Sequence, residues 1–379
     1  MRPDPVVCLD FGTTKTLVAA GDHVLPLGRL DRWMPSLVGL DHTGAILLGE
    51  EADLADPELR IRSIKRAITK RRNDIRDTAI ATVRRTSADE LIVALLDRVA
   101  DRTAAQGVDL RRPRTLAVGC PSVWDSGQRR RFVRLLNAAG IPASLADLVD
   151  EPVAAGIAWL ERQSLSGVTP LRLVVFDMGG GTLDVAVIDV LGPGEDDIHL
   201  LAAVGRAEAG DTLDEAIADD LARDLGLADD DPEVDAPLAG PNFADPGFAH
   251  PDLDDTDLAD PDARRRRDLL LDAARRLKVA LTTEEEAVAP LARDLFAPIT
   301  EVWYQRPRLE AVFAPQMDRA VELVHVALRI AHLSTGTPDA PPEPAPSPEQ
   351  LLAGVDVVLL AGGMSRVPYV THRLRQLFG

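Results

Sequence analysis

Two short segments of the sequence combine residue types that bind phosphate and metal. The first, Asp10–Thr14, reads Asp-Phe-Gly-Thr-Thr, and the second, Asp177–Thr182, reads Asp-Met-Gly-Gly-Gly-Thr. Glycines let backbone amides approach phosphate oxygens, threonine hydroxyls add hydrogen-bond donors, and carboxylates hold a hydrated divalent metal. One segment alone would be weak support, because Gly-Thr turns are common hairpin connections. The pair predicts a nucleotide or other polyphosphate site.

Both segments lie inside the same local pattern, which makes them an internal repeat. Apolar runs of β type flank each one, over 6–9 and 17–20 in the first copy and over 173–176 and 185–188 in the second. Placing Asp10 on Asp177 also places Gly12 on Gly179. The repeat predicts two strand–turn–strand units whose loops face each other and clamp a polyphosphate between two lobes.

Strand and helix patterns alternate along the rest of the chain, as is typical of an α/β protein. Apart from the repeat, the predicted elements are a strand over 45–49, a helix over 88–106, a strand over 116–120 ended by Pro121, helices over 128–139 and 153–160, a strand over 357–361 and a helix over 369–378. The last strand and helix are joined by a glycine turn, another arrangement that handles nucleotides.

Composition narrows the class of protein further. The 379 residues, 46% apolar, suffice for one large two-lobed domain. A formal net charge of −19 argues against nucleic acid and anionic membranes as partners. Cys8 and Cys120 lie in apolar runs and are predicted to be buried and unpaired. No uncharged run reaches membrane-spanning length, and Asp10 interrupts the N-terminal apolar run, so a cytoplasmic location is expected.

Two segments are predicted to be flexible loops within a domain. Residues 228–262 are acidic and proline-rich, and residues 336–348 are rich in Pro, Glu and Ala. Regular patterns resume after each. The arginine run 264–267 is predicted to be the solvated start of a helix instead of a nucleic-acid patch.

With its motifs in this order, the chain resembles the ATPase domain of the heat-shock protein 70 (DnaK-type) chaperones, part of the actin-like ATPase superfamily. The two glycine segments are similar to the family's two phosphate loops. The other similar stretches are 64–68 (the catalytic-lysine segment), 120–129 (a strand-end proline and an arginine), 150–158 (the first connecting helix), Gly210-Asp211 (a third glycine turn) and 362–366 (the adenosine motif). The match runs essentially from end to end.

This resemblance implies an α/β, actin-like fold made of duplicated ribonuclease H-like domains. Lobe I is expected over 1–160 and lobe II over 161–379, around a central nucleotide cleft. The implied cofactors are ATP or ADP and Mg²⁺, with K⁺ as a further candidate ion.

The resemblance also assigns catalytic roles. Phosphoryl transfer to water needs charge neutralisation and an oriented water more than covalent help. Lys65 would place a cation against the developing phosphate charge, and Glu151 and Thr182 would orient the water. Asp10 and Asp177 would hold Mg²⁺ through waters, since magnesium keeps much of its hydration shell. Asp184 is a further catalytic candidate.

A larger set is implied to bind the nucleotide. It comprises Gly12, Thr13, Thr14, Lys15, Gly179, Gly180, Gly181, Thr182, Gly210, Lys278, Thr282, Gly362, Gly363, Met364 and Arg366. Pro121 and Arg129 match the proline and arginine that couple the nucleotide to a partner domain.

Four residues depart from the family's pattern. Lys15 puts a charge beside the first loop, and Arg275 stands where relatives carry a ribose-binding glutamate. Val279 replaces an arginine that stacks on adenine, and Met364 replaces a serine of the adenosine motif. The departures are expected to loosen the base pocket, while the phosphate end is intact.

The chain stops at Gly379, before the family's closing helix, hydrophobic linker and peptide-binding β-domain. We expect either a fragment or a parent protein that carries something else there. The resemblance implies client polypeptides as partners through that absent substrate-binding region, together with a J-domain co-chaperone and a nucleotide exchange factor. The expected role is nucleotide-driven chaperoning or conformational switching.

Two alternatives stay open. One is a sugar kinase of the same superfamily, which the Gly-Gly-Gly-Thr loop, Lys65 and the Pro121–Arg129 pair disfavour. The other is a filament-forming or pseudo-ATPase scaffold of actin type, to which the altered base pocket gives some weight.

Overall fold

The computed structural model describes residues 6–73, 80, 84–163, 170–192, 197–227, 261–335 and 346–379. The chain divides into two compact units, one formed by Met1–Thr212 with Ala314–Gly379 and the other by Leu213–Phe313. The segments predicted to be flexible fall largely outside the described residues, which exclude 228–260 and 336–345. The expected lobe boundary at 160/161 remains a prediction.

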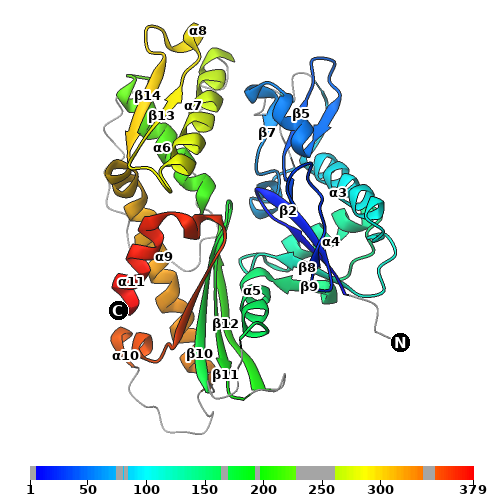
Figure 1. Cartoon of the computed structure of the whole chain (residues 1–379), viewed down its shortest axis with the longest axis vertical. Helices are drawn as coiled ribbons and strands as arrows, with labels where there is room; N and C mark the ends of the chain where they lie inside the picture. Colours follow the sequence, from blue (N-terminus) through cyan, green and yellow to red (C-terminus); the bar gives the residue numbers. More distant parts are fainter. Residues whose placement is uncertain are drawn as a thin grey trace. The chain divides into compact units, whose positions relative to one another are not determined.

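Two sheets in the first unit are built on one plan (Figure 1). In the first sheet, β1 (Val7–Phe11) lies between its antiparallel hairpin partner β2 (Lys15–Ala20) and the parallel strand β8 (Leu116–Cys120). In the second sheet, β10 (Leu171–Met178) lies between its hairpin partner β11 (Leu183–Val190) and the parallel strand β15 (Val357–Ala361). The expected duplication is therefore confirmed.

Shorter strands extend this plan. The first sheet continues through β3 (His23–Val24) and β4 (Met34–Pro35), which both pair with β2, and through β9 (Leu148–Asp150), which pairs with β8. The second sheet continues through β12 (Ile198–Arg206), paired with β11. A separate small sheet has the order β6 (Ile46–Leu48), β5 (Val38–Leu40), β7 (Arg60–Ile61).

Two amphipathic helices, α3 (Ala88–Ala105) and α4 (Ser126–Ala138), cover the first sheet. Their apolar faces join one buried cluster with the alternate residues of β1 that point inward, including Phe11, Leu95 and Phe132. Each helix begins at a capping box, in which the first-turn side chain and the cap satisfy each other's backbone amides. The Asp125 cap explains why α4 starts two residues before the predicted range.

Helix α5 (Glu151–Leu160) follows β9 without an intervening loop and packs on the second sheet. Gly156 permits the close approach, because a methyl group there would lie 2.7 Å from Ile188 Cδ1 and 3.1 Å from Val175 Cγ2. The helix begins at Glu151, two residues before the predicted start, since Pro152 is well suited to a first turn. Glu151 is thereby held at the junction between the two sheets.

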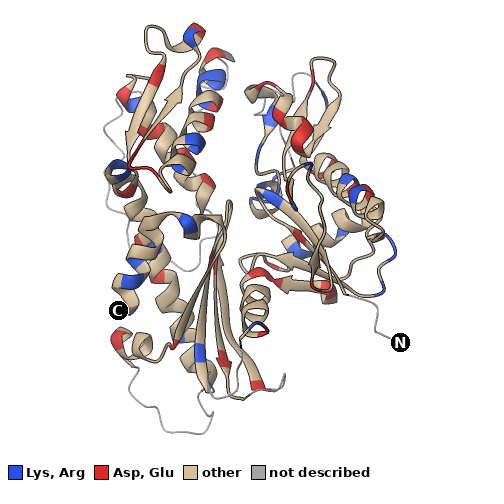
Figure 2. Ribbon diagram, viewed as in Figure 1, with Lys and Arg blue, Asp and Glu red and all other residues tan. Residues whose placement is uncertain are grey.

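The second unit contains most of α6 (Gly210–Asp224), together with α7 (Pro261–Ala280), α8 (Arg293–Phe296) and the hairpin of β13 (Glu286–Pro290) and β14 (Glu301–Gln305). Helix α7 packs against β13. It includes the arginine run 264–267, and the ribbon in Figure 2 shows acidic and basic residues interspersed along α7 and α3.

The remaining helices are α1 (Arg66–Thr69), α9 (Arg306–Thr335), α10 (Pro348–Ala353) and α11 (Pro368–Phe378), with short 3-10 turns at 49–54, 57–59, 145–147 and 363–366. None of the helices in the described ranges has the length and apolarity needed to span a bilayer. The α/β class predicted from the sequence is confirmed.

The prediction that both cysteines are buried is wrong for Cys8. Cys120 is buried, but Cys8 is exposed. Side chains alternate along β1, so Val7 and Leu9 face the core while Cys8 points to the opposite face.

Candidate functional site

An ion pair joins the buried Lys65 to the partly buried Glu151. The Lys65 ammonium lies 2.6 Å from Glu151 Oε1, and the Lys65 side chain is only 2% exposed. Lys65 directly precedes the short helix α1, whereas Glu151 is the first residue of α5. The two sequence-predicted catalytic residues, 86 positions apart, are thus in direct contact.

Three aspartates carry negative charge toward this ion pair. Asp10 reaches solvent on one side, yet desolvation by the surrounding protein and the Glu151 charge raise its pKa to about 6. Burial, followed by the charges of Glu151 and Asp10, raises the pKa of Asp177 to about 7. The pKa of Asp184 also lies well above its usual range, through burial and then Glu151.

For Lys65, burial and the neighbouring charges shift the pKa in opposite directions. Burial alone would lower its pKa, but the charges of Glu151 and Asp10 and the hydrogen bond to Glu151 outweigh it and raise the pKa above the ordinary value. Four carboxyl groups and one ammonium would leave an excess of negative charge if all were ionised, and the raised pKa values of the three aspartates reflect that excess. A hydrated divalent cation would neutralise that excess, so the donor set fits Mg²⁺.

The described side chains do not form a cage that would coordinate a metal ion directly. Within the described ranges, no group of three or more His, Cys, Asp or Glu side chains is close enough together to hold a metal ion. Asp10 and Asp177 are the ligands proposed from the sequence, through waters.

The two glycine loops lie face to face. A methyl group added to Gly180 would come within 2.6 Å of Thr14 Oγ1, and one added to Gly181 within 2.8 Å of Thr13 Oγ1. Only glycine leaves room for such an approach. The hydroxyls of the first loop therefore lie against the backbone of the second.

The same hydrogen bond closes each hairpin. Gly12 N–H donates to the Lys15 carbonyl at 3.0 Å, and Gly179 N–H donates to the Thr182 carbonyl at 3.0 Å. The repeat seen in the sequence thus extends to the turn geometry of the two loops.

A third turn abuts the second loop. Gly210 N–H donates to the Gly179 carbonyl at 3.1 Å, and Asp211 N–H donates to the Gly180 carbonyl at 2.7 Å. The buried Asp211 carboxylate also lies 3.7 Å from the guanidinium of Arg66, the residue after Lys65. The predicted turn at Gly210 is therefore part of this cluster.

Asp184 is oriented by backbone and hydroxyl donors. Its Oδ1 accepts the Val123 N–H at 3.2 Å, and the Thr182 hydroxyl also bonds to this carboxylate. Gly205 leaves the space that Asp184 fills. Asp184 therefore ties β11 to the segment that follows Pro121.

That segment leads back to Glu151. Arg129 donates from Nε to the Trp124 carbonyl at 3.0 Å and from Nη2 to Asp150 Oδ1 at 2.5 Å. Asp150 immediately precedes Glu151. Sequence reasoning selected Pro121 and Arg129 but missed the Arg129–Asp150 pair, because no local pattern indicates it.

The strand end after β15 lies close to Asp177. Gly362 has φ 76°, and a methyl group there would come within 2.6 Å of Asp177 Oδ1. Gly363 borders open space, Met364 is buried and Arg366 is exposed. Gly362 is thus the member of the predicted adenosine motif that joins the cluster directly.

Lys278 and Thr282, the other predicted nucleotide ligands, belong to the second unit. Lys278 Nζ lies 2.6 Å from Asp214 Oδ1, and Arg275 Nε donates to Asp214 Oδ2 at 3.2 Å. Asp214 is buried and was missed by sequence reasoning, although it lies one helical turn after Gly210. Thr282 donates to the Val279 carbonyl at 2.7 Å.

Lys15 is held beside the first loop by an aromatic ring. Its ammonium lies 4.0 Å from the centroid of the Trp33 ring. A cation–π contact with Trp33 therefore holds the positive charge of Lys15 beside the first loop.

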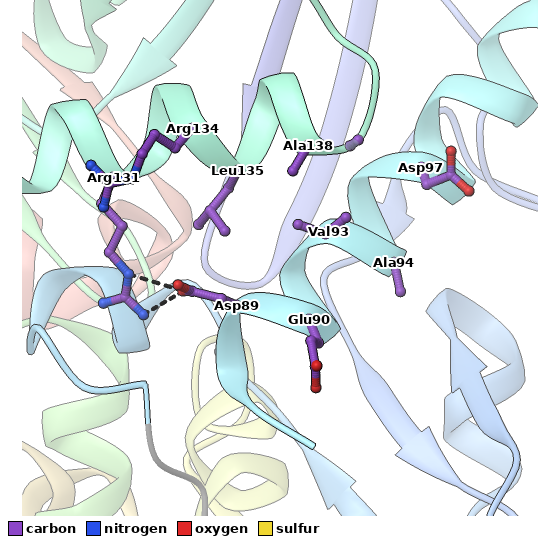
Figure 3. A pocket seen from close by; sticks show the side chains of 10 residues that line it. Asp89, Glu90, Val93, Ala94, Asp97, Arg131, Arg134, Leu135 and Ala138 are labelled. Carbon is purple, nitrogen blue, oxygen red and sulfur yellow. Dashed lines mark hydrogen bonds and ion pairs between the residues drawn. The ribbon is translucent and has the colours of Figure 1, made fainter. Parts of the chain in front are cut away.

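A surface groove of about 620 Å³ lies elsewhere, between α3 and α4 (Figure 3). Carboxylates from α3 and arginines from α4 form its walls, and Arg131 reaches across to Asp89. It contains none of the predicted site residues.

Comparison with known proteins assigns this chain to a family. The family model described as Hsp70 protein matches residues 6–231, more than half of the chain. The chaperone protein DnaK of Thermotoga maritima is 26% identical over 396 residues, covering 99% of this chain and 55% of that protein. DnaK of Thermosipho melanesiensis is 25% identical over 393 residues, covering 100% and 56%.

The chain spans about half the length of these curated relatives. The matched residues include both glycine loops, Lys65 and Glu151. The chain belongs to the Hsp70 protein family and has its α/β, actin-like ATPase fold.

Proposed function

We propose that this chain binds ATP and hydrolyses it with Mg²⁺, and that it acts as the nucleotide-driven switch of an Hsp70-type chaperone. One observation carries the proposal: the Lys65–Glu151 pair lies within electrostatic reach of Asp10 and Asp177, which open the two facing glycine loops.

Each group in the cluster has a task that suits its chemistry. The magnesium ion would neutralise phosphate charge. Lys65 stabilises the charge that develops on the transferred phosphoryl group, and its buried position makes that charge effective. Glu151, held by Lys65, orients the attacking water and accepts its proton, with help from Thr182.

The phosphate chain is held by donors of the facing loops. The hydroxyls of Thr13 and Thr14 lie against Gly180 and Gly181, so donors from both hairpins converge on one place. Lys15, supported by Trp33, adds a positive charge at the rim of the first loop.

The chaperone role extends the proposal beyond this chain. The relatives are chaperone proteins, and the match covers 55–56% of their length. We propose that client polypeptides bind to a further region of the full-length protein, and that a J-domain co-chaperone and a nucleotide exchange factor control turnover in the cytoplasm.

The test is phosphate release from ATP by the purified chain, with Mg²⁺ and no acceptor. We expect slow turnover, and a Glu151→Gln variant slower by roughly 10²–10³, the usual loss when one preorganised catalytic group is removed. Glu161→Gln, at the exposed end of the same helix, is the matched control and should turn over like the wild type.

Either alternative gives a different result. A sugar kinase would consume ATP only when a sugar acceptor is added. A scaffold would bind nucleotide without turnover or would pellet as filaments. Each outcome would contradict the proposed ATPase.

A further inference from the structure

We propose that Trp124 is a positioning residue whose indole ring fixes the Lys65 ammonium against Glu151. The inference rests on the proposed function for its effect on turnover, and on the geometry of the free protein for the contact itself.

The contact is a desolvated cation–π pair. The Lys65 ammonium lies 5.2 Å from the centroid of the Trp124 ring. Both residues are 2% exposed, so water competes little with the ring for the charge. Cation–π attraction is strongest under these conditions. The Glu151 carboxylate at 2.6 Å and the indole ring are therefore two separate restraints on one ammonium.

The ring is itself fixed. Its Nε1–H donates to Thr69 Oγ1 at 2.9 Å. It packs edge-on against Phe132, with ring centroids 5.3 Å apart, and Phe132 stacks on Phe11 at 5.9 Å. Phe11 is the last residue of β1 and precedes Gly12 of the first loop. The aromatic stack thus runs from the first phosphate loop to the catalytic cation.

The backbone that presents Lys65 needs such support. Helix α1 has four residues, too few to be stable alone. Donors from α4 satisfy its carbonyls: Gln128 Nε2 donates to the Thr69 carbonyl at 2.6 Å, and Arg131 Nη1 donates to the Ala67 carbonyl at 2.8 Å. The Trp124 indole adds a third donor to the same short helix.

These contacts close a ring around the site. Lys65 pairs with Glu151, Glu151 follows Asp150, Asp150 pairs with Arg129, Arg129 donates to the Trp124 carbonyl, and the Trp124 ring faces Lys65. A shift of the Trp124 ring moves the ammonium relative to the Glu151 carboxylate. Trp124 links Arg129 to Lys65, through its carbonyl on one side and its indole on the other.

The chain contains four lysines, Lys15, Lys65, Lys70 and Lys278, which makes the contact measurable. We would label the lysine amines of the whole chain with nitrogen-15 and record their ammonium signals without nucleotide, assigned by single Lys→Arg variants. Trp124→Leu should shift the Lys65 signal downfield as ring shielding is lost. Trp124→Phe should retain most of the shielding, and Thr69→Val should cause a smaller shift.

The second lysine–tryptophan pair is the matched control. Trp33→Leu should shift the Lys15 signal and leave the Lys65 signal unchanged. A Lys65 signal that keeps its wild-type position in every folded variant of the set Trp124→Leu, Trp124→Phe and Thr69→Val would overturn the contact. The last two variants keep the core nearly filled, so the test survives if Trp124→Leu does not fold.

Turnover tests the consequence. Single-turnover hydrolysis should fall roughly 10-fold in Trp124→Leu and about 2-fold to 3-fold in Trp124→Phe, with ATP affinity nearly unchanged. Trp303→Leu, at an exposed site in the second unit, should match the wild type. A normal rate in Trp124→Leu would overturn the positioning role. If the wild type releases no phosphate while the Lys65 signal shifts as expected, the proposed function is what fails.

Discussion

Arg129 donates to Asp150, with Nη2 2.5 Å from Oδ1, and Asp150 immediately precedes Glu151. The same guanidinium holds the Trp124 carbonyl three residues after Pro121. An arginine in the first turns of α4 therefore contacts both the side chain that precedes Glu151 and the backbone of Trp124, whose ring faces Lys65. Such an arrangement suits transmission of the nucleotide state to a bound partner.

The first prediction concerns this coupling. A hydrophobic linker peptide, or an added C-terminal region, should stimulate ATP hydrolysis severalfold. Arg129→Ala should abolish the stimulation and change the basal rate far less, because Arg129 does not touch the reacting groups. Steady-state phosphate release with and without the peptide measures both.

Asp150→Asn tests the path of the coupling. If the signal passes through the Arg129–Asp150 pair, this variant should lose the stimulation as well, and the double variant should be no worse than either single one. Equal stimulation in wild type and Arg129→Ala would mean that the domain works without this relay.

The second prediction concerns Lys65. Lys65→Ala should leave ATP binding nearly intact and slow single-turnover hydrolysis by roughly 10²–10³, because a preorganised buried charge is lost. Lys70→Ala, an exposed lysine at the end of the same short helix, should have little effect. An unchanged single-turnover rate in Lys65→Ala would remove Lys65 from the mechanism.

The third prediction concerns the metal. Asp10→Asn and Asp177→Asn should each weaken Mg²⁺-dependent ATP binding, because a neutral amide attracts a hydrated cation less than a carboxylate does. Nucleotide affinity followed during a Mg²⁺ titration measures the effect. Wild-type magnesium dependence in both variants would refute the paired-loop clamp.

The fourth prediction concerns stability and pH in the second unit. Tyr304 donates to Asp220 Oδ2 at 2.5 Å, and Arg308 Nε donates to the same oxygen at 2.6 Å. Burial alone would raise the pKa of Asp220, but hydrogen bonds from Arg308 and Tyr304 outweigh it and lower the pKa. A carboxyl whose pKa is lower in the folded state stabilises that state above its unfolded pKa, and this stabilisation is lost as the pH falls.

Asp220→Asn should therefore cost about 2–3 kcal/mol at pH 7, the scale of buried hydrogen bonds to a charged group. The difference from wild type should shrink below pH of about 4, near the ordinary pKa of an aspartate. Denaturant unfolding at both pH values measures this. Asp224→Asn, at the more exposed partner of Arg308, is the control and should have a small effect. A cost independent of pH would show that packing, and not charge, is responsible.

The sequence predicted the parts of the molecule that have local signatures. Both glycine hairpins, the α3 and α4 patterns and the strand ended by Pro121 were visible, because each depends on neighbours along the chain. The approach of the two glycine loops was also predicted, since their glycine and hydroxyl patterns are chemically specific.

Contacts between segments far apart in the sequence could not be predicted. The parallel pairing of β1 with β8 and of β10 with β15 joins strands separated by long stretches of chain. No local sequence pattern near Asp214 indicates that it pairs with Lys278, and none near Trp124 indicates that its ring faces Lys65. The exposure of Cys8 depends on which face of the first sheet is covered, a property of the whole unit.

The duplicated sheets also have a consequence for how such a protein can change over time. The two hairpins are closed by the same hydrogen bond, yet the parallel strand is followed by Pro121 in one copy and by Gly362 in the other. Each copy contributes an aspartate and a glycine loop to the same cluster, whereas Lys65 and Glu151 lie outside both hairpins. The altered positions Arg275, Val279 and Met364 all lie outside the first copy. A lineage can thus change the residues of the predicted base pocket while both hairpins and the Lys65–Glu151 pair stay unchanged.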